Sequence, residues 1–132
     1  WTQADFSGKR ILLVEDNELN REIAEAILEE TGFIVDSVPD GTDAVDIMRR
    51  VEEHYYDAVL MDVQMPVMDG YEATRTIRAL PRKDVKNLPI IAMTANAMEE
   101  DKEAALKNGM NAHIAKPLDI ELFLKILGKF LN

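Results

Sequence analysis

The sequence contains no cysteine, which excludes a disulfide framework and a thiolate metal site. It has no apolar run long enough to cross a membrane, and no basic segment followed by an apolar stretch opens the chain. We therefore expect a cytoplasmic domain with no direct membrane contact. Because the chain begins with Trp1 and not with a start methionine, it could be part of a longer parent protein, and that parent could be membrane-anchored.

Positive charge is also scarce, with 15 Lys and Arg against 25 Asp and Glu and a net charge of −10. A protein that binds nucleic acid directly needs a basic patch, so we do not expect that function. The acidic balance fits a bound cation or a basic partner, although it also serves solubility alone. The length of 132 residues suits one domain. We assign residues 1–6 to a linker remnant and residues 7–132 to the domain.

The apolar pattern alternates between two periods along the chain. Short apolar runs predict strands at 11–14, 33–38, 57–62, 88–93 and 112–115. Helical spacing of apolar residues predicts a helix that begins after the N-cap Asn17, and others at 44–51, 71–80, 97–107 and 123–131. The helix at 97–107 has the weakest apolar stripe. Strands that alternate with helices predict an α/β fold in three layers, a doubly wound parallel sheet with helices on both faces.

Residues able to carry chemistry follow four of the predicted strands. Glu15 and Asp16 follow the first strand, Asp62 ends the third, Thr94 follows the fourth and Lys116 follows the fifth. Sheets of this kind place their sites at the carboxyl ends of the strands. If the first and third strands are neighbours, three carboxylates meet in one crevice. Each residue alone could be an ordinary cap or surface residue, but their joint placement favours a site.

Three clustered carboxylates repel one another, by roughly 4 kcal/mol per pair at about 4 Å and an effective dielectric constant near 20. The cluster therefore needs a hard cation, a lysine or raised pKa values. Oxygen ligands suit Mg²⁺, for which Mn²⁺ could substitute. Lys116 could neutralise a phosphate oxygen, and Thr94 could donate a hydrogen bond to another. An aspartate nucleophile beside a metal and a lysine fits phosphoryl transfer to Asp62.

Four stretches of sequence carry a family resemblance: ILLVEDN, DAVLMDVQMPVMDGYEATRTIR, PIIAMTANA and HIAKP. Over residues 8–132 the chain resembles the receiver domain of two-component response regulators. Its segment GMNAHIAKPLDIELF is most similar to receivers of hybrid sensor histidine kinases. The resemblance implies a flavodoxin-like fold of five strands in the order 2-1-3-4-5 with five helices. It also implies a switch in a phosphorelay, which takes a phosphoryl group from a phosphohistidine and relays it or changes a protein-binding surface.

The resemblance also implies roles for individual residues. It makes Asp62 the phosphoacceptor, Thr94 the switch hydroxyl and Lys116 the conserved-type lysine, usually in a cis Lys–Pro bond. The implied Mg²⁺ ligands are Glu15, Asp16, Asp62 and the backbone carbonyl of Gln64.

Three positions bear on switching and on the lifetime of the phosphoryl group. His113 occupies the switch position where Tyr or Phe is common, which puts coupling to Thr94 in question. Gln64 and Asn96 occupy positions that tune the phosphoryl lifetime in the family.

The implied phosphodonor is a histidine kinase or a histidine phosphotransfer protein, with Leu19 and Met65 as candidate apolar contacts. A dimer could form through the helix at 97–107, the strand at 112–115 and the last helix. Such a module catalyses its own phosphorylation and dephosphorylation, and the parent could be a hybrid kinase.

Two other functions remain open from the sequence. One is a Mg²⁺-dependent phosphatase with an aspartate nucleophile that acts on small phosphate esters. The position two residues after the nucleophile, where such enzymes carry an acid–base aspartate, is Gln64. The other is a flavin-binding module, against which stands the absence of a phosphate-binding loop after the first strand.

Overall fold

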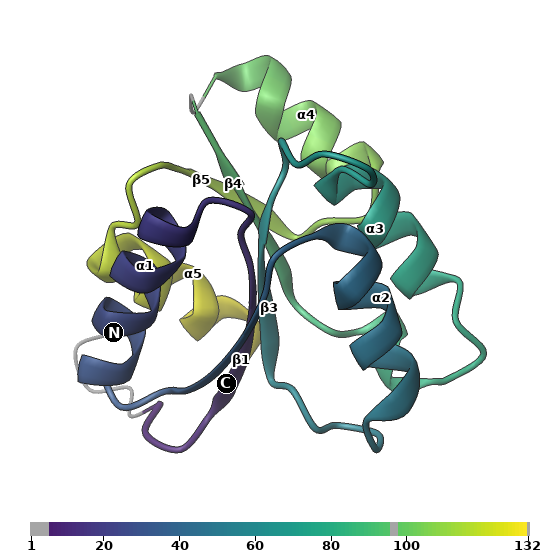
Figure 1. Ribbon diagram of the computed structural model, residues 1–132, viewed down its shortest axis with the longest axis horizontal. Coiled ribbons are helices and arrows are strands. Elements are labelled where there is room, and N and C mark those ends of the chain that lie inside the picture. The colour runs from purple at the N-terminus through teal and green to yellow at the C-terminus, as the bar shows by residue number, and fades with distance from the viewer. Residues whose placement is uncertain (1–5, 96–97, 132) are drawn as a thin grey trace.

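Five parallel strands form one sheet in the order β2-β1-β3-β4-β5, which confirms the predicted topology. The computed structural model describes residues 6–95 and 98–131. The strands are β1 (Arg10–Val14), β2 (Ile34–Val38), β3 (Ala58–Asp62), β4 (Ile90–Thr94) and β5 (Ala112–Ala115). Their parallel direction brings all five carboxyl ends to one edge of the sheet (Figure 1).

Helices cover both faces of the sheet, so the fold has the three layers that were predicted (Figure 1). They are α1 (Glu18–Glu30), α2 (Gly41–Arg50), α3 (Gly70–Arg78), α4 (Glu99–Lys107) and α5 (Ile120–Phe130). A short 3₁₀ helix, η1 (Asp84–Lys86), was not predicted. None of the helices in the described ranges is long and apolar enough to span a bilayer.

Helix boundaries follow the capping side chains more closely than the apolar spacing. Asn17 caps α1 as predicted, since its side chain accepts a hydrogen bond from the backbone N–H of Asn20. The last helix begins at Ile120, earlier than predicted, because Asp119 caps it in the same way through the N–H of Leu122. The caps therefore let a helix begin before the first residue of its predicted apolar stripe.

The sheet separates two apolar cores, because successive side chains of a strand point to opposite faces. One core lies under α1 and α5 and includes Leu28, Leu60, Ile91 and Phe123. The other lies under α2, α3 and α4. All five residues of β3 and all five of β4 are buried, as expected for central strands covered on both faces.

Phe6 belongs to the packed core, so the prediction that residues 1–6 form a linker outside it was wrong at this position. Its side chain is 6% exposed and stacks on Phe33, with ring centroids 6.0 Å apart. Phe33 in turn meets Phe123 of α5 edge-on. The aromatic contacts join the start of the described chain to its last helix; residues 1–5 lie outside the described ranges.

Replacing Phe6 with alanine should therefore lower the free energy of unfolding by about 3 kcal/mol, because the buried ring is lost and a cavity remains. Urea unfolding followed by circular dichroism measures the change. Leu122→Ala is the matched control: Leu122 is 41% exposed, so its replacement should change stability by less than about 0.5 kcal/mol. Equal stability of Phe6→Ala and the parent protein would contradict the packing of Phe6.

Candidate functional site

The candidate site lies at the carboxyl edge of the sheet, at the point where the strand order reverses between β1 and β3. β1 has β2 on one side and β3 on the other, so the loops that follow β1 and β3 leave toward opposite faces and open a crevice between them. Val14 is in register with Met61, which places Glu15 beside Asp62. The predicted convergence of these two carboxylates therefore follows from strand order and register.

Asp62 ends β3 with its carboxylate turned into the protein, and the residue is only 1% exposed. Its Oδ2 lies 3.0 Å from Nζ of Lys116, and its Oδ1 accepts a hydrogen bond of 3.3 Å from the N–H of Gln64. Among the described residues no donor gives Oδ2 a well-directed hydrogen bond. This oxygen is thus held by its ion pair with Lys116 and keeps acceptor capacity for another electrophile or cation.

The loop after β3 depends on a glycine. A Cβ at Gly70 would lie 2.4 Å from the carbonyl oxygen of Asp62, closer than any side chain permits. Gly70 instead donates its N–H to the carbonyl of Val63, and Asp69 caps α3 through the N–H of Glu72. The start of α3 is in this way fixed directly against the backbone of Asp62.

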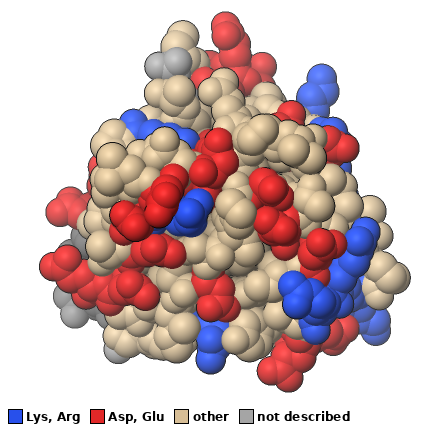
Figure 2. All heavy atoms as spheres, viewed as in Figure 1, with Lys and Arg blue, Asp and Glu red and all other residues tan. Residues whose placement is uncertain are grey.

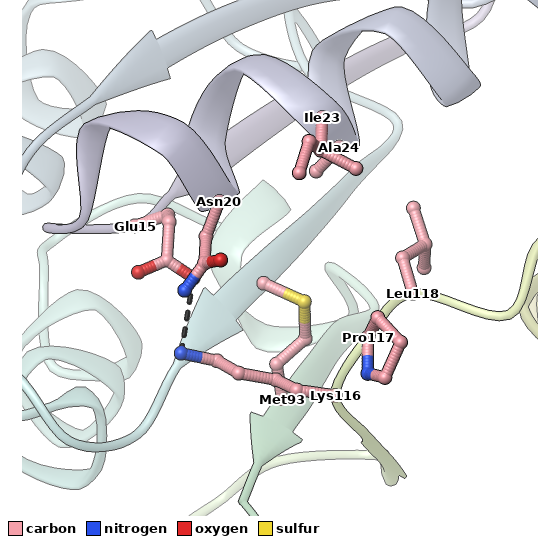
Figure 3. Close-up of a pocket in the computed structure, with 8 residues that line it drawn as sticks. All are labelled: Glu15, Asn20, Ile23, Ala24, Met93, Lys116, Pro117 and Leu118. Carbon is pink, nitrogen blue, oxygen red and sulfur yellow. Dashed lines mark ion pairs between the residues drawn. The ribbon is translucent and has the colours of Figure 1, made fainter.

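Glu15 is the second buried carboxylate of the site and is also 1% exposed. Its Oε1 lies 3.0 Å from Nζ of Lys116, the ion pair drawn in Figure 3. Its Oε2 accepts a hydrogen bond from the N–H of Asn17, and its backbone carbonyl accepts one from Arg21. Lys116 therefore bridges Glu15 and Asp62, two buried carboxylates that follow neighbouring strands.

Charge in this pocket is unbalanced. Burial, helped by the negative charge of Glu15, raises the pKa of Asp62 to about 7 even though Lys116 opposes the shift. Burial works to lower the pKa of Lys116, but its ion pairs with Asp62 and Glu15 outweigh it and raise that pKa. One ammonium thus leaves the pocket short of positive charge.

A divalent cation fits this deficit. Carboxylate oxygens of Glu15, Asp16 and Asp62 all lie within 4.8 Å of one another, and Asp16 is exposed at the mouth. The donors are all oxygens, as Mg²⁺ prefers. The incompletely satisfied Oδ2 of Asp62 provides a further acceptor. Three of the predicted ligands are therefore together in space, and the backbone of the fourth, Gln64, adjoins Asp62.

Thr94 lies beside this group in an adjoining hollow of about 60 Å³, which Gln64 and Asp101 also line. The hydroxyl of Thr94 is turned toward β5, where it donates a long hydrogen bond of 3.5 Å to the carbonyl of Ile114. The structure thus brings Glu15, Asp16, Asp62 and Lys116 together, while Thr94 is a neighbour with its own contact.

The remaining predicted positions have different outcomes. His113 is partly buried on β5, and its Nε2 is buried without a hydrogen-bond partner in the described part of the chain. Asn96 lies outside the described residues. The peptide bond before Pro117 is cis, as the family resemblance implied. Met65 is 8% exposed and packs in the core, so it is not an available surface contact, in contrast to what was predicted.

Two residues near the site were not predicted from the sequence. Asn20 points from α1 toward Glu15 and Lys116 at the end of a cavity of about 280 Å³ (Figure 3), and Arg21 donates to the Glu15 carbonyl at 2.8 Å. The helical spacing after Asn17 could have indicated both residues. It places residues 20 and 21 about one turn into the helix, next to the end of β1.

Comparisons with known proteins agree with this geometry. Residues 11–128 match the family model described as the response regulator receiver domain. The chain is 39% identical over 130 residues to probable histidine kinase 6 of Oryza sativa subsp. japonica. It is 35% identical over 121 residues to hybrid signal transduction histidine kinase I of Dictyostelium discoideum. The matches cover 86% and 90% of this chain but only 13% and 7% of those kinases.

Solved structures give the same result. The receiver domain of a sensor histidine kinase from Pseudomonas aeruginosa PAO1, with magnesium in its active-site cleft, is 45% identical at a TM-score of 0.81, covering 94% of this chain and 98% of that one. The receiver domain of Saccharomyces cerevisiae Ssk1, solved with the phosphotransfer protein Ypd1, is 27% identical at a TM-score of 0.81, covering 94% and 89%.

These matches are to signalling receivers and give no support to the phosphatase alternative. Together with the strand order and the carboxylate–lysine pocket, they identify the chain as a member of the response regulator receiver domain family, a receiver domain of a two-component phosphorelay.

Proposed function

We propose that Asp62 accepts the phosphoryl group, from a phosphohistidine on a histidine kinase or a histidine phosphotransfer protein. The observation that carries this assignment is the Oδ2 of Asp62, buried, charge-paired with Lys116 and short of hydrogen bonds. This oxygen therefore has acceptor capacity left for a phosphoryl group. Glu15 makes the same two kinds of contact, since Oε2 accepts from Asn17 and Oε1 pairs with Lys116; among the described residues it is Oδ2 of Asp62 that is fully buried without a directed hydrogen bond.

The chemical step is a displacement at phosphorus. An oxygen of the ionised Asp62 carboxylate forms the new P–O bond while the P–N bond to the donor imidazole breaks, and the imidazole leaves as the neutral ring because its other nitrogen already carries a proton. Lys116, already at 3.0 Å from Asp62, neutralises charge on the transferring group. The Gln64 N–H holds the other carboxylate oxygen at 3.3 Å and so orients the nucleophile. Thr94 then turns from Ile114 toward the phosphoryl group.

Glu15, Asp16, Asp62 and the Gln64 carbonyl are the proposed holders of Mg²⁺, with Mn²⁺ as a substitute. When bound, the cation supplies the second positive charge that draws electron density from the phosphoryl oxygens. The buried pair Glu15 and Asp62 fixes the inner side of this site, and the exposed Asp16 closes its outer side.

The phosphodonor is proposed to dock on α1 and the adjoining loops. Leu19 is 64% exposed and Ile23 is 46% exposed on the same helical face, and Ile23 and Pro117 line the cavity beside Lys116. Acidic side chains gather on the side of the molecule occupied by α1 (Figure 2). A donor with an apolar centre and a basic rim is complementary to it.

The output surface is proposed to be the face formed by α4, β5 and α5, which is also the proposed dimer contact. Leu106 on α4 and Phe130 on α5 are 50% and 39% exposed there. They border a hollow that also includes His113. Phosphorylation would shift the population between two arrangements of this face.

Incubation with acetyl phosphate and Mg²⁺ should add the mass of one phosphoryl group to the protein, and Asp62→Asn should abolish the addition because the amide is not a nucleophile of this kind. Intact mass spectrometry measures both results. Asp46→Asn, an exposed change on α2, is the control and should still be phosphorylated. Phosphorylation of the Asp62→Asn protein at another site, at the rate of the parent, would overturn the assignment.

Asp16→Asn should weaken Mg²⁺ binding at least about tenfold, the loss typical even for partners outside the first coordination shell. The increase in the thermal unfolding midpoint with Mg²⁺ concentration reports the affinity. Glu18→Gln removes the same charge two residues away, in the exposed first turn of α1, and should leave the affinity within about twofold. Similar affinities for the two variants would mean that only the general negative field attracts the cation.

Leu19→Asp should slow phosphoryl transfer from a phosphorylated histidine phosphotransfer protein at least about tenfold, because a charge replaces an apolar docking contact. Transfer from acetyl phosphate, which needs no docking surface, should be unchanged. Leu122→Asp on α5 is the control for an added surface charge. If Leu19→Asp slows both donors equally, the substitution acts on the pocket and the docking proposal is wrong.

A further inference from the structure

The two ends of α4 are held very differently. Asn17, Asp40, Asp69 and Asp119 each cap their helix through a side-chain oxygen, but the N-cap of α4 is Met98, which makes no side-chain capping bond. Within α4 only Ala105, close to its C-terminal end, is buried. The N-terminal half of α4 therefore has little holding it to the domain.

The C-terminal end of α4 is closed by a complete backbone motif. Gly109, with φ of 96°, donates its N–H to the carbonyl of Leu106, and Met110 donates to the carbonyl of Ala105 at 2.9 Å. These two bonds form the Schellman arrangement, which satisfies the last carbonyls of a helix. Met110 is 3% exposed, so its buried side chain anchors the motif in the core.

Arg78, the last residue of α3, donates hydrogen bonds to the backbone at this end of α4. Its Nε and Nη2 donate to the carbonyl of Gly109 at 3.0 and 2.8 Å. Its Nη1 donates to the carbonyls of Val85 and Leu88, each at 2.6 Å, and its Nη2 also donates to Oδ1 of Asn111 at 2.9 Å. The guanidinium thus joins α3, η1 and the turn between α4 and β5.

Two further contacts complete the connection. Asn111, which Arg78 holds, also accepts the N–H of Ile90 and donates its own N–H to the Ile90 carbonyl at 2.8 Å, so the same group fixes the start of β4. Arg75, one turn earlier on α3, donates to the side chain of Asn108 at the C-cap of α4. No ion pair with a carboxylate is made by Arg78 in the described structure; its partners are backbone and amide oxygens.

The weakly held N-terminal end of α4 is the end that faces the site. Asp101, in its first turn, lines the hollow shared with Thr94 and Gln64. A change at Thr94 therefore reaches the weakly held end of α4 first.

We propose that Arg78 is a positioning residue that makes the C-terminal end of α4 a fixed hinge, so that the response to phosphorylation is confined to the N-terminal half of the helix. The proposal rests on the proposed phosphorylation of Asp62. In this proposal α3, which follows the loop after Asp62, holds the C-terminal end of α4 in place while the N-terminal half of α4 moves.

Hydrogen exchange read by mass spectrometry tests the hinge in the parent protein with Mg²⁺, with and without excess acetyl phosphate. Exchange in residues 99–103 should change on phosphorylation, and exchange in residues 106–111 should stay the same. Arg78→Gln should speed exchange in residues 106–111 at least about tenfold and make that segment respond to phosphorylation as well. Arg78→Lys should lie between the two, because an ammonium cannot reproduce the planar fork.

Arg50→Gln is the matched control, since Arg50 is an exposed arginine that likewise ends its helix; its exchange should equal that of the parent. Arg75→Gln, which loses only the contact to Asn108, provides a milder variant if Arg78→Gln unfolds. Equal changes at both ends of α4 in the parent protein, or an unchanged response in folded Arg78→Gln, would overturn the hinge. Loss of the phosphoryl mass itself would instead overturn the proposed function.

Discussion

The shared lysine is the interaction on which the site depends. Lys116 holds two buried carboxylates, Glu15 and Asp62, at 3.0 Å each. Burying an unpaired carboxylate is costly, and this ammonium offsets part of the cost of burying both. Yet one positive charge does not balance the pocket: burial, together with the negative charge of Glu15, still raises the pKa of Asp62. The single ammonium therefore leaves the pocket with an excess of negative charge, which a divalent cation can neutralise.

The fold supplies this arrangement through strand order. β1 and β3 are neighbours in space although α1, β2 and α2 separate them in sequence, and this brings Glu15 and Asp62 together. Lys116 reaches them from β5, two strands away from β3, because its long side chain extends along the carboxyl edge of the sheet. The close approach of Gly70 to the Asp62 backbone fixes the start of α3 at the same place. A different order of these strands would separate the charges that make the pocket.

The strand pattern and the residues of the pocket could be predicted from the residues themselves, while the order of the strands in the sheet came from the family resemblance. Apolar periodicity locates the strands, and the rule that sites lie at strand carboxyl ends selects Glu15, Asp62 and Lys116. What the sequence did not reveal depends on side-chain directions across long separations. The burial of Phe6 requires the packing of three aromatic rings from three distant segments. The orientation of Thr94 toward β5 and the grip of Arg78 on Gly109 likewise depend on tertiary contacts that no local pattern encodes.

The uneven packing of the helices decides where a signal can travel. In the proposed function, a phosphoryl group on Asp62 would add negative charge to a pocket that is already short of positive charge, and Thr94, whose hydrogen bond to the Ile114 carbonyl is long at 3.5 Å, is the neighbouring donor that would turn toward it. α3 buries four residues of its nine, whereas α4, of the same length, buries one. Displacing α3 would expose apolar surface, at roughly 25 cal/mol per Å², while displacing the first turns of α4 exposes almost none. Under the proposed phosphorylation, the rearrangement would therefore pass to α4 and would stop where Arg78 of α3 holds the end of that helix.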